Sequence, residues 1–158
     1  MRERLTGLVF MASGGLMTAL VLAMVFEAAG RQLDAEQERA AVEQVLKDQS
    51  EAWNRGDLDA FMDGYDRSGQ LTFYSGGAVH QGWDAALQRY RERYQAKERG
   101  MGTLSFRDLR VELAGQDLAW VRGAYLLTDG PKSDAGLFTL VLRKTPAGWR
   151  IVHDHTSQ

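Results

Sequence analysis

The chain has 158 residues, of which 44% are hydrophobic, and this is enough for one domain with a hydrophobic core. Its formal net charge of −2, without a cluster of basic residues, argues against a nucleic-acid partner. The absence of cysteine excludes disulfides, zinc sites with cysteine ligands, cysteine nucleophiles and lipid attachment through cysteine.

An uncharged run of 22 residues, Leu5 to Phe26, lies near the N-terminus, and its second half is almost entirely apolar. The length suits a membrane-spanning helix, whereas the two arginines before the run and the small residues Ala28-Ala29-Gly30 after it also suit a secretory signal. Both interpretations predict that the rest of the chain is exported, to the periplasm or out of the cell. We therefore predict a signal peptide or membrane anchor with a short linker at 1–33 and a folded domain at 34–158. We expect membrane contact only through the N-terminal segment.

Two helices are predicted at the start of the domain. Asp34 can cap the first helix, which ends at Gly56, and apolar spacing of three and four residues gives that helix one buried face. This face is formed by Val42, Val45, Leu46, Gln49, Ala52 and Trp53. Asp57 can cap a short second helix. The inner side of the second helix carries Leu58, Phe61, Met62 and Tyr65.

A predicted pair of short strands follows, Leu71–Ser75 and Ala78–Gln81, joined by a turn at Gly76-Gly77. Gly82 opens a third helix with one apolar face. That face carries Trp83, Leu87, Tyr90 and Tyr94.

Strand-like runs with short turns between them make up the rest of the chain: Thr103–Leu113, Leu118–Thr128, Ala135–Arg143 and Trp149–Thr156. Consecutive strands joined by short turns form an antiparallel meander. Three helices followed by a curved antiparallel sheet predict an α+β fold with the helices on one face of the sheet.

The last of these strands carries several ionisable groups. Strict alternation places Trp149, Ile151, His153 and His155 on one face, and it places Arg150, Val152, Asp154 and Thr156 on the other. Burying ionisable groups without partners costs several kcal/mol. The strand therefore either supplies partners for them or lines a cavity.

Three motifs are present: Ala-Trp-Asn-Arg-Gly-Asp at 52–57, Gly-Trp-Asp at 82–84 and Gly-Trp-Arg-Ile-Val-His-Asp-His-Thr-Ser at 148–157. With the order of elements, they resemble the nuclear transport factor 2-like superfamily, also called SnoaL-like, over residues 36–157. The last motif is similar to the closing strand of the association domain of calcium/calmodulin-dependent protein kinase II. The resemblance implies a cone-shaped fold that dimerises through the outer sheet face and encloses a pocket between helices and sheet. Some members are isomerases, dehydratases or cyclases, and many have no assigned reaction.

Arg122 lies in an otherwise apolar strand and needs a partner. The resemblance to the kinase domain implies that this arginine faces the pocket, where it would pair with Asp154 or hold a ligand carboxylate. An arginine at a sheet edge or dimer rim is the alternative. Aromatic side chains suited to pocket walls complete the candidate ligand-binding set, with ordinary core packing as their alternative. The set is Trp53, Tyr74, Tyr90, Trp120, Arg122 and Asp154.

His153 and His155 share a strand face, as a metal pair would, but no third ligand is evident, and we expect no metal and no cofactor. They are expected at a dimer seam on the outer face, or in the pocket if the alternation is reversed. Asp154, His153 and His155 are the candidate catalytic residues. The first helix presents only Gln49 and Trp53 to the pocket, which argues against a reaction like that of the steroid isomerases.

We therefore predict an exported homodimeric domain that binds a small aromatic or carboxylate-bearing molecule in a helix/sheet pocket. One alternative is an isomerase, dehydratase or cyclase that uses an Asp or His of the pocket, and another is a pure dimerisation module. The predicted dimer seam includes Leu140, Leu142 and Ile151.

Overall fold

The computed structural model describes residues 10–95, 101–129 and 133–157, and the chain divides into two compact units at Gln37/Glu38. Helix α1 (Phe10–Asn54) runs through this boundary, so Asp34 lies inside a helix and the prediction that it caps one is wrong. The cause is that the apolar run before Asp34 is itself helical. Residues 5–9 of the predicted leader lie outside the described residues.

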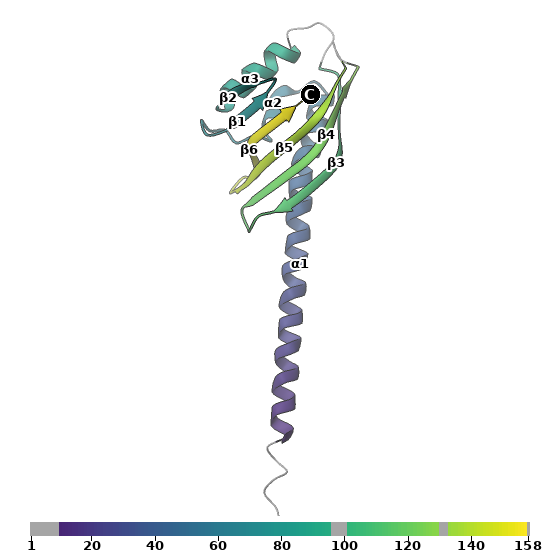
Figure 1. The fold of residues 1–158 in the computed structure, drawn as a ribbon, viewed down its shortest axis with the longest axis vertical. Coiled ribbons are helices and arrows are strands. Elements are labelled where there is room, and N and C mark those ends of the chain that lie inside the picture. The colour runs from purple at the N-terminus through teal and green to yellow at the C-terminus, as the bar shows by residue number, and fades with distance from the viewer. Residues whose placement is uncertain (1–9, 96–100, 130–132, 158) are drawn as a thin grey trace, which may run out of the picture. The chain divides into compact units, whose positions relative to one another are not determined.

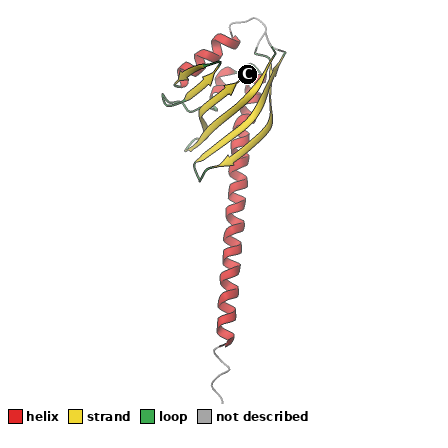
Figure 2. Ribbon diagram, in the orientation of Figure 1, coloured by secondary structure: helices red, strands yellow, loops and turns green. Residues whose placement is uncertain are grey.

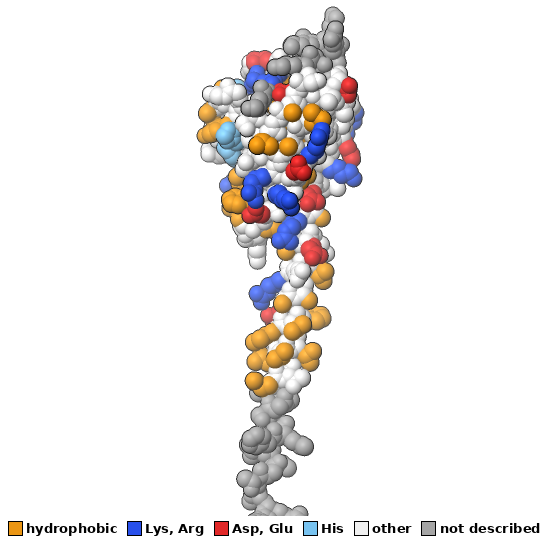
Figure 3. Space-filling view, turned by 45° about the vertical axis from the view of Figure 1, so that its right-hand side comes forward, with side chains coloured by type: hydrophobic (Ala, Val, Ile, Leu, Met, Phe, Trp, Pro, Cys, Tyr) orange, Lys and Arg blue, Asp and Glu red, His pale blue; other side chains and the backbone are white. Residues whose placement is uncertain are grey.

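The N-terminal unit exposes many large apolar side chains on α1, visible as the apolar surface of that helix in Figure 3. They are Met17, Leu20, Val21, Leu22, Met24, Val25, Phe26 and Leu33. Within the residues whose side chains are described, no helix has the length and hydropathy of a membrane span.

In the second unit, the C-terminal part of α1 buries the face predicted from its spacing. The buried residues are Val42, Leu46, Gln49, Ala52 and Trp53. Two residues at the end of the helix connect it to strand β3 (Thr103–Leu113). The Trp53 indole N–H donates to the Met101 carbonyl (3.2 Å), and the Asn54 amide exchanges two hydrogen bonds with the Leu104 backbone (2.6 and 3.1 Å). The Trp-Asn pair of the first motif therefore joins α1 to the sheet.

The rest of that motif forms the sharp turn into helix α2 (Leu58–Met62). Gly56 adopts a φ of +78°, in the left-handed region that favours glycine at a helix end. Asp57 caps α2, as predicted, because its carboxylate accepts a hydrogen bond from the Ala60 N–H (3.0 Å). Together, Gly56 and Asp57 end one helix and begin the next within two residues.

Helix α3 (Trp83–Tyr90) continues into a short π-helical turn, η1 (Arg91–Gln95). The Trp83 indole N–H donates to the carbonyl of Met62 at the end of α2 (3.1 Å). The second motif therefore joins α3 to α2.

The six strands form one curved, open sheet with the order β2-β1-β6-β5-β4-β3, and Figures 1 and 2 show the helices of this unit on one side of it. The other five strands are β1 (Thr72–Ser75), β2 (Ala78–Gln81), β4 (Leu118–Thr128), β5 (Asp134–Thr145) and β6 (Gly148–Ser157). The predicted antiparallel meander β3 to β6 is confirmed. The hairpin β1–β2 joins it through a parallel pairing of β1 with β6, which the local pattern does not predict.

A β-bulge in β6 changes the predicted alternation. Leu142 of β5 pairs with Ile151, but the adjacent Val141 pairs with His153, so Val152 is an extra residue in β6. The extra residue shifts the following side chains to the opposite face. The inner face, which we define as the one toward the helices, therefore carries Trp149, Ile151, Asp154 and Thr156.

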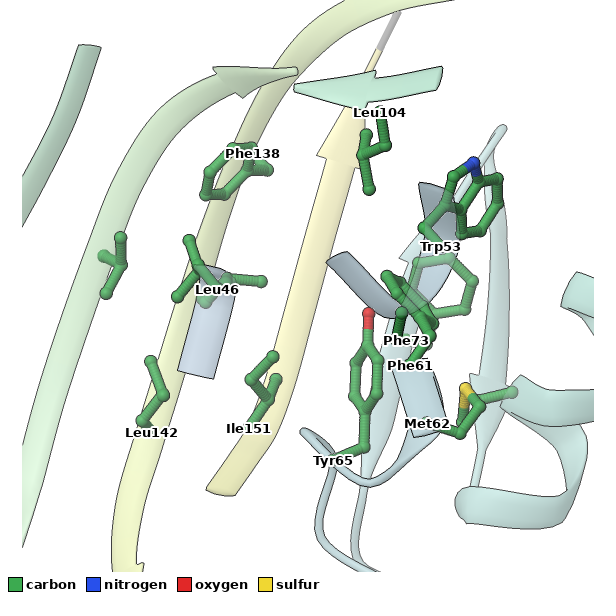
Figure 4. Packing of buried hydrophobic residues seen from close by; sticks show 14 of the residues in the cluster. Leu46, Trp53, Phe61, Met62, Tyr65, Phe73, Leu104, Phe138, Leu142 and Ile151 are labelled. Carbon is green, nitrogen blue, oxygen red and sulfur yellow. The ribbon is translucent and has the colours of Figure 1, made fainter. Parts of the chain in front are cut away.

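The hydrophobic core lies between this inner face and the helices, and Figure 4 shows Leu46, Leu142 and Ile151 packed within it. Leu140, Leu142 and Ile151 are all buried there. Their prediction as dimer-seam residues is wrong, because their side chains point to the inner face.

Candidate functional site

A cavity of about 80 Å³ opens between the inner sheet face and the helices. This volume holds several water-sized spheres, which sets the scale for a small ligand. Half of the residues that line it are aromatic, as in many small-molecule sites. The aromatic residues of the wall are Trp53, Phe61, Tyr65, Phe73, Tyr90, Tyr94, Phe106, Tyr125 and Phe138.

At the cavity, the Asp154 carboxylate accepts two hydrogen bonds. The Tyr65 hydroxyl donates to Oδ2 (2.7 Å) and the Thr156 hydroxyl donates to Oδ1 (2.8 Å). A third hydroxyl, that of Tyr90, lies 3.0 Å from the Tyr65 hydroxyl. Because Tyr65 gives its single proton to Asp154, Tyr90 donates to Tyr65, and the three groups form a directed chain.

Burial is the main influence on Asp154, whose side chain is almost inaccessible to solvent. It raises the pKa of Asp154 to about 6, although the hydrogen bonds from Tyr65 and Thr156 act in the opposite direction. At pH 7 the ionised form of this carboxyl is therefore still the main one. Asp154 is a carboxylate near neutrality that readily takes up a proton.

Tyr65 and Tyr90, the two tyrosines of this hydrogen-bonded chain, remain protonated. Burial, followed by the charge of Asp154, raises the pKa of Tyr65 and that of Tyr90 well above the ordinary value. Both hydroxyls therefore keep their protons and act as hydrogen-bond donors at any physiological pH.

Tyr65 reaches Asp154 because the segment after α2 pairs with β6. The Ile151 N–H donates to the Gly64 carbonyl (2.9 Å), and the Asp66 N–H donates to the Ile151 carbonyl (2.8 Å). Tyr65 is therefore held beside β6, and Figure 4 shows its hydroxyl directed into the cluster that contains Phe61 and Phe73.

Two arginines on the α3–η1 segment also line the cavity. Arg93 forms an ion pair with Asp134 (2.7 Å). Arg89 forms no ion pair with any described residue, and its guanidinium lies beside the Gly76 turn. The cavity thus combines an apolar wall, one carboxylate and positive charge.

Three of the predicted ligand-binding residues line the cavity: Trp53, Tyr90 and Asp154. Trp53 and Tyr90 pack edge to face, with ring centroids 6.0 Å apart. Their place in the wall was indicated by helical spacing, which put each on the inner face of its helix.

The predictions that Arg122 and Trp120 face the pocket are wrong. Arg122 pairs with Glu112 and lies over the Trp120 ring, 5.9 Å from its centroid. Both residues are exposed, because the buried Val121 between them takes the inner face. The predicted pair of Arg122 with Asp154 is therefore replaced by an exposed pair on the outer face, the one opposite the helices.

Tyr74 lies on the outer face too, so its placement in the pocket wall is wrong. Its ring contacts His153 and His155 edge to face, at 5.0 and 5.9 Å between centroids. His153 Nδ1 and the Thr72 hydroxyl share a hydrogen bond (2.5 Å). The pKa of His153 is lowered, mainly by burial and next by the charge of the neighbouring His155. Alternation keeps both histidines on the face opposite Asp154, and the bulge before them makes that face the outer one, so neither reaches the cavity.

Sequence reasoning did not select Tyr65 or Gln49 as site residues, although it put both on inner helix faces. Nothing local distinguishes Tyr65 from a core residue, since its role depends on the pairing of residues 64–66 with β6. Among the described residues, no group of three His, Asp or Glu side chains is arranged to hold a metal ion.

Residues 42–158 match the family described as the SnoaL-like domain. The chain belongs to the SnoaL-like family. A solved NTF-2 like protein of unknown function from Shewanella oneidensis MR-1 is 37% identical, with a TM-score of 0.69 over 75% of this chain and 98% of that one. No curated protein matches the chain.

Two other solved structures resemble this SnoaL-like chain in fold. A candidate dehydratase of the NTF2-like family from Streptomyces avermitilis is 23% identical, with a TM-score of 0.64 over 78% of this chain and 96% of that one. A candidate ketosteroid isomerase from Shewanella frigidimarina is 22% identical, with a TM-score of 0.59 over 74% of this chain and 94% of that one.

Proposed function

We propose that this domain binds a small, mainly aromatic molecule in the cavity and catalyses a proton transfer on it, with Asp154 as the base. The observation that carries the proposal is the buried Asp154 carboxylate, with a pKa of about 6, at an aromatic cavity. A base is most effective when its pKa lies near the working pH. The reaction class is an isomerisation or loss of water that begins at a carbon next to a carbonyl.

The proposed step is simple in its balance of atoms. Asp154 takes the proton from the carbon, the electrons of that C–H bond form a C=C bond, and the carbonyl oxygen becomes an enolate. The Tyr90 hydroxyl, at the far end of the chain from Asp154, can turn to donate to that oxygen. Returning the proton to another carbon gives an isomer. In a dehydration, the enolate electrons form a C=C bond as the C–O bond of a neighbouring hydroxyl breaks, and the leaving oxygen takes the proton from Asp154 to depart as water.

The candidate dehydratase and the candidate ketosteroid isomerase that share this fold support this class, because removal of a proton next to a carbonyl can begin both a dehydration and an isomerisation. Arg89 and Arg93 at the cavity support a ligand that carries an acidic group as well.

Binding without a reaction is the second candidate function. It is favoured by the two hydrogen bonds that Asp154 already accepts, since each weakens a carboxylate as a base. A test that separates the two candidates is hydrogen–deuterium exchange of the methyl group of acetophenone in D₂O, followed by NMR. Catalysed exchange that disappears in Asp154→Asn supports the enzyme, whereas binding of the ketone without exchange supports a binding domain.

We also propose a homodimer formed through the outer face, where Trp120 and Leu137 are exposed. The proposal also includes the likeness of residues 148–157 to the closing strand of the kinase association domain. That likeness rests on the sequence motif at these residues alone. Sedimentation of residues 34–158 at micromolar concentration tests it, and a monomer would contradict it.

Export of the domain is the last part of the proposal. It is supported by the uncharged run from Leu5 to Phe26 and by the exposed apolar side chains of α1. A reporter fused after Gln158 should be active only outside the cytoplasm.

A further inference from the structure

Gln49 is a buried polar side chain at the cavity. It lies on the inner face of α1, its side chain lines the cavity, and only 2% of the residue is exposed. An amide buried in an aromatic wall is costly unless its hydrogen-bonding groups are used. The orientation of the amide shows which of its groups is used.

The nitrogen end is fixed by the main chain. Gln49 Nε2 lies 3.2 Å from the Phe61 carbonyl oxygen, which can only accept a hydrogen bond, so this end of the amide is the donor. The other end, Oε1, accepts no hydrogen bond from residues 10–95, 101–129 or 133–157. This acceptor is therefore unused, and since it is not among the fully inaccessible unpaired atoms of the described residues, it keeps surface open to a partner.

Gly64 holds the amide in this position. A Cβ atom at Gly64 would lie 2.7 Å from Gln49 Nε2 and 2.8 Å from its Cγ and Cδ atoms. The Gly64 carbonyl is fixed by the Ile151 N–H (2.9 Å), so the main chain cannot easily move away. The missing side chain of Gly64 therefore makes the space that Gln49 fills.

We infer that Gln49 determines specificity: its Oε1 accepts a hydrogen bond from a hydroxyl or N–H group of the ligand. The inference rests on the proposed function, because it concerns the same cavity. It names the substrate class more closely, as a small aromatic carbonyl compound that also carries a hydrogen-bond donor. Such a compound satisfies Gln49 with its donor while its carbonyl side faces Asp154 and the tyrosines.

Matched probes test this assignment. The probes are the three hydroxyacetophenone isomers and the three methylacetophenones, in which a methyl group replaces the hydroxyl. We expect at least one hydroxyl isomer to bind the full chain about tenfold more tightly than its methyl partner, the effect of one hydrogen bond. In Gln49→Leu this ratio should fall to about one, with the affinity for the methyl compound almost unchanged.

A matched control, Gly64→Ala, keeps Gln49 in the chain but displaces its side-chain amide. Gly64→Ala should push Gln49 out of place and also lower the hydroxyl preference, because the amide no longer faces the ligand. Thermal melting of each variant reports whether it folds. Should both variants unfold, the Gln49 side-chain amide resonances of the wild type decide: they should shift with the hydroxyl probe and not with the methyl probe.

The outcomes separate this inference from the proposed reaction. Equal affinity of the wild type for hydroxyl and methyl probes, or a preference retained in Gln49→Leu, would overturn the role of Gln49. Methyl-group exchange measured on the same samples reports on Asp154 independently. A hydroxyl preference without exchange supports the role of Gln49 and rejects catalysis. Exchange without a hydroxyl preference supports catalysis by Asp154 and overturns the role of Gln49.

Discussion

The two faces of the sheet carry similar side chains in very different surroundings. On the inner face, Asp154 meets Tyr65 and Tyr90 in a cavity closed by helices. On the outer face, Glu112 meets Arg122, which lies over Trp120 in solvent. Figure 3 shows charged side chains of both signs interspersed over the surface of the domain.

The difference shows that burial, more than residue type, decides what a carboxylate can do. The Arg122–Glu112 side chains are 55% and 49% exposed, so water competes for both and the pair contributes at most about 1 kcal/mol. Asp154 is buried away from solvent, and this raises its pKa to about 6. Substitutions matched between the two faces test this comparison.

The largest effect is expected from the loss of the inner carboxylate. Asp154→Asn should slow the exchange of the acetophenone methyl protons by about 100-fold or more, the range for a general base. The matched outer substitution, Glu112→Gln, should leave the rate within about twofold. Comparable rates in both variants would show that Asp154 is not the base.

The second effect concerns stability and pH. Because the folded pKa of Asp154 is raised, its contribution to stability is fully present below about pH 4 and is lost as the pH rises through 6. At pH 8 the ionised carboxylate lowers the free energy of unfolding by roughly 3 kcal/mol. Asp154→Asn should therefore be more stable than the wild type at pH 8, by that amount minus the contribution of the hydrogen bonds that the substitution removes. Urea unfolding at pH 8 and pH 4 checks this, and an advantage that does not shrink toward pH 4 would contradict it.

The third effect tests the hydroxyl chain. Tyr65→Phe removes a donor from a buried carboxylate and should destabilise the domain by about 1.5 to 3 kcal/mol. It should also raise the pKa of Asp154 further, since the Tyr65 hydrogen bond lowers it. Tyr74→Phe on the outer face is the control, with an expected change below about 0.5 kcal/mol. Carbon NMR of the Asp154 carboxyl measures the pKa in each variant.

The smallest effect is expected on the outer face. A double-mutant cycle with Arg122→Met and Glu112→Leu should give a coupling of about 0.2 to 1 kcal/mol that weakens with salt. The same cycle between Arg122 and Asp154 should give almost none, because they lie on opposite faces. A coupling above about 1 kcal/mol for Arg122 and Asp154 would reverse the assignment of the two faces.

The order of the helices and strands, and most of their bounds, could be predicted from the amino-acid sequence, because these depend on signals within a few residues. Gly56 and Asp57 end one helix and cap the next through their own backbone and side-chain preferences. Helical spacing likewise placed Trp53 and Tyr90 in the cavity wall. The start of α1 is the exception, since the local cap at Asp34 was outweighed by the helical run before it.

Which strand residues share the site depends on contacts between distant parts of the chain, and local patterns do not predict it. The face of Asp154 depends on the extra residue Val152, and a bulge is defined by pairing with β5, not by the residues of β6 alone. Tyr65 reaches Asp154 through a contact between segments 89 residues apart in sequence. Arg122 was misplaced because its pocket-facing position came from the resemblance to the kinase domain. Alternation gives the residues that lie together on a strand, but packing decides which face the helices cover.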